Sequence, residues 1–92
     1  MYIDSPIWTL KKRCPCCYQE GYLELYTCDE CKKIVAICDE VCTVFINPLD
    51  INLDKISDKE NDVCYYCNSM GKMRRSKDYE LISLGLTTSD YE

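Results

Sequence analysis

Histidine is absent from the 92 residues of the chain. This absence removes the commonest general base and the commonest ligand of catalytic zinc. Phe and Trp are scarce as well, with one of each beside eight Tyr. A chain of this length buries only about 60–65% of the surface that it exposes when unfolded, so its core is small. We therefore expect a staple, made of disulfides or of bound metal, to complete the fold.

The chain also lacks an export signal and a long apolar run. Its first residues do not have the basic start and apolar stretch of a secretory signal, and no segment approaches membrane-spanning length. We therefore expect a cytoplasmic protein with no membrane contact, in a compartment where thiols stay reduced. A metal, and not a set of disulfides, is then the expected staple.

Cysteine, in contrast, is abundant. The chain has nine cysteines, and seven of them lie in residues 12–42. Eight of the nine form pairs with a spacing typical of metal knuckles, namely Cys14 and Cys17, Cys28 and Cys31, Cys64 and Cys67, and the wider pair Cys38 and Cys42. Because a structural zinc ion takes four ligands, these pairs predict two zinc ions, with one ion as the alternative. Cys16, inside the first knuckle, is interpreted as a spare thiol.

The spacing leaves open which pairs share a metal. We favour a sequential arrangement, in which Cys14 and Cys17 join Cys28 and Cys31 across the ten residues between them. The rival arrangement is interleaved, with 14/17 joined to 38/42 and 28/31 joined to 64/67. In a third alternative a single zinc is bound, and Cys38 and Cys42 pack in the core as small apolar side chains.

The segments between the cysteines predict a small metal-stapled α+β domain, with zinc-ribbon-like antiparallel β-hairpins and a short C-terminal helix. Apolar and β-branched runs predict strands at 22–26, 32–37 and 42–46. A single domain is expected over 1–92, and its flanking parts are an N-terminal arm at 1–11, an acidic connecting loop at 49–63, and a C-terminal helix and tail at 76–92. Within that last part, Ser76 is expected to cap a helix over 77–84 that ends at Gly85.

The order of these motifs resembles that of small bacterial zinc-ribbon proteins. The segments that carry the likeness are "CPCC", "GYL" and the second C-x-x-C, followed by "IVAICDE", "TVFINP" and the last C-x-x-C. The C-terminal "LISLGL" and "YE" are similar too, so the resemblance covers most of residues 12–92. It implies a structural zinc-bearing fold with no activity attached.

Charge decides between classes of partner. The formal charge is −5, and two tetrathiolate zinc sites would bring it to roughly −9, because metal-bound thiols are deprotonated. An anionic protein is a poor generic ligand for nucleic acid. Nucleic-acid or transcription-associated binding through the basic runs at 11–13 and 72–77 is therefore only the alternative function. Both runs flank knuckles whose thiolates attract cations, and this attraction explains the basic residues without a nucleic-acid ligand.

We expect no enzyme, because all-cysteine zinc sites are closed and no general base accompanies them. The favoured function is a noncatalytic zinc-binding module that binds a protein partner. Its small size and acidic charge suggest, most specifically, an immunity or antitoxin protein that neutralises a toxin. The residues expected to meet a basic partner are all acidic: Glu20, Glu24, Asp39, Glu40, Asp50, Asp54, Asp58, Glu60 and Asp62.

Overall fold

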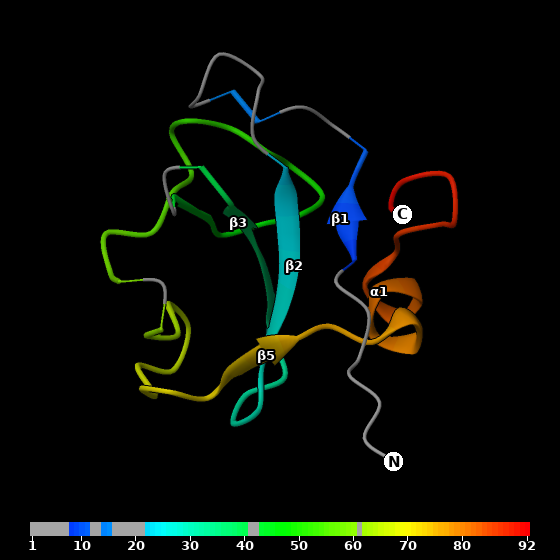
Figure 1. The fold of residues 1–92 in the computed structure, drawn as a ribbon. Coiled ribbons are helices and arrows are strands. Elements are labelled where there is room, and N and C mark those ends of the chain that lie inside the picture. The colour runs from blue at the N-terminus through cyan, green and yellow to red at the C-terminus, as the bar shows by residue number, and fades with distance from the viewer. Residues whose placement is uncertain (1–7, 12–13, 16–21, 41–42, 61) are drawn as a thin grey trace.

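An antiparallel sheet forms the centre of the fold, in a computed structural model that describes residues 8–11, 14–15, 22–40, 43–60 and 62–92 (Figure 1). Its strands are β1 (Thr9–Leu10), β2 (Leu23–Cys28), β3 (Ile34–Cys38), β4 (Val44–Phe45) and β5 (Met73–Arg75). The first four lie side by side in chain order. The fifth pairs with β2, beyond the part of that strand that β1 covers.

Local sequence explains the central hairpin of β2 and β3. In β2 buried and half-buried residues alternate over the first four positions, whereas β3 is a run of buried residues that are mostly β-branched. Five residue pairs join the two strands in antiparallel register. The expected strands at 22–26, 32–37 and 42–46 therefore occur, although β2 runs on to Cys28 and β4 is shorter than expected. Within the expected N-terminal arm at 1–11, Thr9–Leu10 form an edge strand, while residues 1–7 lie outside the described part of the chain.

Both faces of the sheet bury apolar side chains. The larger core lies on the face that carries the helix, where Leu23, Leu25, Ala36 and Phe45 are fully buried against Leu81. The other face buries a smaller cluster formed by Val35, Ile37 and Val44. Residues 55–60 and 62–70 lie on the side of β2 away from the helix (Figure 1). A two-sided sheet in so short a chain leaves little core on either face, as expected from the length of the chain.

The single helix of the described residues, α1 (Asp78–Leu84), begins one residue later than expected. Its N-cap is Lys77 and not Ser76, and the backbone N–H of Lys77 donates a hydrogen bond of 2.9 Å to the Glu80 carboxylate. The predicted end at Gly85 is confirmed. This glycine has a φ of 116°, a left-handed conformation that favours glycine, and its N–H donates to the carbonyl of Ile82.

Ser76 has a different role from the predicted cap. Its side chain is fully buried, and its hydroxyl shares a hydrogen bond of 2.7 Å with the hydroxyl of Thr27 in β2. Glu80 lies beside this pair, and its carboxylate binds the guanidinium of Arg74 at 2.8 and 2.9 Å. That contact with Arg74 lowers the pKa of Glu80 below its ordinary value. A helix of seven residues is too short to be stable alone, so these contacts and the burial of Leu81 hold it on the sheet.

We expect Ser76→Ala to lower the free energy of unfolding by about 1–3 kcal/mol, because it removes the closest partner of the buried Thr27 hydroxyl. Urea unfolding of the metal-loaded protein measures this loss. Ser83→Ala, on the exposed face of the same helix, is the matched control and should change stability by less than about 0.5 kcal/mol. Equal effects of the two substitutions would show that the buried pair contributes nothing.

Candidate metal centre

Two segments with the same local conformation supply the candidate metal ligands. In the first, the backbone N–H of Lys32 donates to the carbonyl of Cys28 at 2.8 Å, and Lys32 has a left-handed φ of 63°. In the second, the N–H of Asn68 donates to the carbonyl of Cys64 at 2.9 Å, and Asn68 also has a φ of 63°. In each turn the backbone N–H of the first cysteine also donates a hydrogen bond to the carbonyl of the residue five positions later. The C-x-x-C sequence therefore folds into the same knuckle twice.

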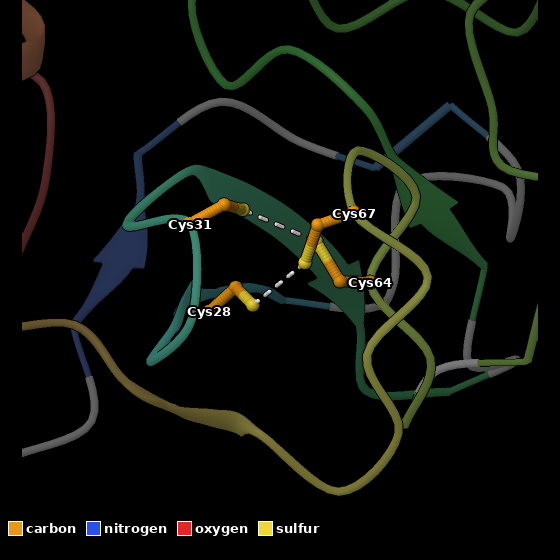
Figure 2. A group of neighbouring side chains, drawn as sticks. All are labelled: Cys28, Cys31, Cys64 and Cys67. Atoms are coloured by element: carbon orange, nitrogen blue, oxygen red, sulfur yellow. Dashed lines mark hydrogen bonds between the residues drawn. The ribbon is translucent and has the colours of Figure 1, made fainter.

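These two knuckles face each other and bring their sulfurs together (Figure 2). The Sγ atoms of Cys28 and Cys67 lie 3.6 Å apart, and those of Cys31 and Cys64 lie 3.5 Å apart. All four ligand atoms lie within 4.8 Å of one another. Sulfurs at 2.3 Å from a tetrahedral zinc would be about 3.8 Å apart, so the arrangement fits a metal with small adjustments. We call this group the four-cysteine cluster: Cys28, Cys31, Cys64 and Cys67.

The cluster is buried on one side and open on the other. Cys28 and Cys64 are buried, whereas Cys31 and Cys67 lie nearer to solvent. Burial raises the pKa of Cys31 to about 12, while hydrogen bonds from the hydroxyl and backbone of Ser69 lower the pKa of Cys67 to about 6. A bound metal requires thiolates at all four positions, so metal uptake must release protons and must weaken as the pH falls.

The four-cysteine cluster corrects the favoured pairing of knuckles. We expected Cys28 and Cys31 to share a metal with Cys14 and Cys17, and this is wrong, because they meet the pair at 64 and 67 instead. The strand register explains the error. Leu10 of β1 and Cys38 of β3 both pair with Leu23, five positions before Cys28, and five positions along a strand span roughly 16 Å. The first knuckle follows β1 and therefore belongs to the opposite end of the sheet.

The remaining cysteines are described only in part. Cys14 and Cys38 are fully buried and belong to the same core cluster. Their sequence partners Cys17 and Cys42, and the predicted spare thiol Cys16, lie outside the described residues. Of the two arrangements with two zinc ions, the four-cysteine cluster agrees with the interleaved one, and it is also compatible with a single zinc.

The acidic residues expected to bind a partner do not form one group. Glu24 accepts a bond from the Tyr26 hydroxyl, and the carboxylate of Asp39 accepts one from the backbone N–H of Tyr22, at the end of the sheet away from the four-cysteine cluster. Asp50 forms an ion pair of 2.6 Å with Lys55. The other described members are exposed, namely Glu40, Asp54, Asp58, Glu60 and Asp62, while Glu20 lies outside the described residues.

The basic runs are also partly occupied. Arg74, in the run at 72–77, binds the carboxylates of Asp29 and Glu80, and Lys32 binds Asp29 at 3.2 Å. These cations are therefore neutralised by carboxylates, in addition to any attraction from nearby thiolates. In the run at 11–13, Lys11 is exposed and the other two residues lie outside the described part of the chain.

Comparisons with protein-family models, curated proteins and solved structures find no match for this chain. The four-cysteine cluster indicates a possible metal site, and none of these comparisons supports the resemblance to bacterial zinc-ribbon proteins. Among the described residues, no helix has the length and apolar character needed to cross a membrane.

We expect the metal to be required for folding. A structural zinc contributes on the order of 10–16 kcal/mol of apparent free energy in small domains, so chelation should abolish the circular dichroism of the sheet. Cys64→Ser should likewise lose the metal held by the four-cysteine cluster, seen in cobalt-loaded protein as a loss of thiolate-to-metal absorption. Cys16→Ser is the control and should retain it. A spectrum that survives chelation unchanged would contradict a structural role.

Proposed function

We propose that the chain is a noncatalytic zinc protein that binds a protein partner, in its most specific form an immunity or antitoxin protein. The observation that carries the proposal is the four-cysteine cluster, which joins two knuckles that are distant in sequence. Four soft thiolate donors at tetrahedral spacing favour zinc among the common metals of proteins. A site with four protein ligands has no open position for a substrate, which supports a structural role.

We further propose a second zinc, held by the remaining two pairs. Cys14 and Cys38 belong to the same buried core cluster, and each has a second cysteine close by in sequence, Cys17 and Cys42. In this interleaved arrangement each zinc would sit at one end of the hairpin of β2 and β3. The two metals would then stabilise both ends of a sheet whose apolar core is small.

The absence of histidine and the closed donor set support a protein without catalytic activity. The negative charge, which zinc thiolates would increase, supports a protein partner with a basic surface. Binding to nucleic acid has less support, because Arg74 in the main basic run is bound to two carboxylates. Capture of a basic toxin is the specific form of the proposal that suits a small acidic chain of this kind.

Metal counting tests the two-zinc proposal. We expect two zinc ions per chain in the purified protein and one in each of the variants Cys64→Ser and Cys38→Ser, because each substitution breaks a different site. Elemental analysis on samples of known protein concentration gives the ratio. If Cys38→Ser retains the full count, Cys38 is a core residue and not a ligand. A count of one zinc in the unsubstituted protein would show that the second site does not exist.

Partner capture tests the binding proposal. We expect the zinc-loaded protein to retain one stoichiometric protein from an extract of the cells that naturally express it, in the presence of nuclease. Reversing four exposed acidic residues of the 49–63 loop should weaken this capture at least tenfold, mainly by slowing association: Asp54→Lys, Asp58→Lys, Glu60→Lys and Asp62→Lys. Metal content and circular dichroism should stay unchanged. Recovery of nucleic acid in place of a protein would favour the alternative function.

A further inference from the structure

Two tyrosines occupy the tip of the knuckle formed by Cys64 and Cys67. Tyr65 and Tyr66 are the residues between Cys64 and Cys67, and their side chains remain 39% and 42% exposed. Their rings pack edge to face, with centroids 5.5 Å apart and an interplanar angle of 89°. The hydroxyl of Tyr66 donates a hydrogen bond of 2.8 Å to the carbonyl of Ile46. The pair is therefore held in place, although it faces solvent.

Each of these rings already has an ammonium group over it. The Nζ of Lys59 lies 6.0 Å from the centre of the Tyr65 ring, and the Nζ of Lys33 lies 5.7 Å from that of Tyr66. Such distances are those of cation–π contacts, in which the negative face of the ring attracts the charge. Both lysines come from outside the 64–67 knuckle, so each ring already attracts an ammonium group from another segment, which a cationic side chain of a partner would have to replace or join.

Three acidic residues closely precede the tyrosine pair in sequence. The contact of Lys59 with Tyr65 brings to the ring a residue whose neighbours in sequence are Asp58 and Glu60. A β-bridge between Val63 and Met70 closes the base of the knuckle, next to Asp62 in sequence. Asp58, Glu60 and Asp62 are exposed, and their carboxylates form no ion pair or hydrogen bond with any described residue.

We propose that this knuckle tip is the docking site for an arginine- or lysine-bearing segment of a protein partner. The knuckle tip consists of Asp58, Glu60, Asp62, Tyr65 and Tyr66. The proposal rests on the function proposed above and assigns its binding site. Tyrosine offers a large contact area for little loss of side-chain entropy and is enriched among the residues that dominate binding energy. Free carboxylates next to it attract cationic side chains and repel phosphates, so the knuckle tip fits a basic protein and not a nucleic acid.

A metal held by the four-cysteine cluster would make this site rigid. Cys64 and Cys67 flank the tyrosines directly, so ligation of both cysteines fixes the backbone on each side of the pair. A preorganised site loses less entropy on binding. The docking site and the four-cysteine cluster are thus two parts of the same knuckle.

A defined cationic probe tests the assignment. We would measure the binding of a synthetic ten-residue peptide of alternating arginine and glycine to the zinc-loaded full chain, with a glutamate–glycine peptide as the negative probe. Tyr65→Ala should weaken binding of the arginine peptide about tenfold, as expected for a residue that dominates an interface. Tyr65→Phe keeps the ring face and should stay within about twofold of the unsubstituted protein.

Tyr79→Ala is the matched control for the tyrosine. Tyr79 is 58% exposed on helix α1 and also has a lysine over its ring, with the Nζ of Lys77 at 5.9 Å from the centroid. Its removal should leave binding unchanged. Equal losses for Tyr65→Ala and Tyr79→Ala would overturn the docking site, since any exposed tyrosine would then serve, while the proposed protein-binding function would stand.

Charge is tested in the same way. The triple variant Asp58→Asn, Glu60→Gln and Asp62→Asn should weaken the peptide at least tenfold, and more than the charge-matched triple variant Glu30→Gln, Glu40→Gln and Glu92→Gln. Equal effects would show that only the net charge matters and would overturn the site. Absence of arginine-peptide binding would also overturn it. The function proposed above would fail separately, if the zinc-loaded protein retained no partner from its own cells.

Discussion

The four-cysteine cluster is the junction on which the rest of the structure depends. It joins the turn after β2 to a knuckle more than thirty residues further along the chain. The segment between β4 and β5 contains no helix and no strand among its described residues, and one bridge, from Phe45 to Ile56, ties its first half to the sheet. Such a segment buries too little apolar surface to order itself, so the junction must fix its far end.

The same junction positions the C-terminal helix. Once the 64–67 knuckle lies against the turn at 28–32, the chain that follows this knuckle runs along the free edge of β2 and forms β5. Arg74 in this strand then binds Asp29 in the turn and Glu80 in the helix. Asp29, Arg74 and Glu80 thus form a continuous polar connection from the metal knuckle to the helix, and the buried pair of Thr27 and Ser76 lies beneath it. Loss of the metal should therefore loosen the helix as well as the knuckles.

Local features of the fold could be predicted from the sequence, whereas long-range ones could not. The β-branched run before Cys38 and the glycine at 85 determine a strand and a helix end by their own conformational preferences. In contrast, β5 has the sequence Met-Arg-Arg, which carries no strand pattern, and it becomes a strand because β2 offers it a free edge. Serine is a residue type that often caps a helix, but the hydroxyl of Ser76 shares a hydrogen bond with Thr27, 49 positions away, and no local pattern reveals this contact.

The partition of the cysteines follows the same division. Spacing alone identified the knuckles, because a tight turn with a left-handed fifth residue is a local structure. Which knuckles meet depends on which end of a strand each one occupies, and this is set by the register of β1, β2 and β3. Cys28 ends β2 at the end of the strand away from its pairing with β1, so it lies far from the end of the sheet at which β1 leaves. In this sheet the four-cysteine cluster therefore joins knuckles that are distant in sequence but lie at the same end of β2.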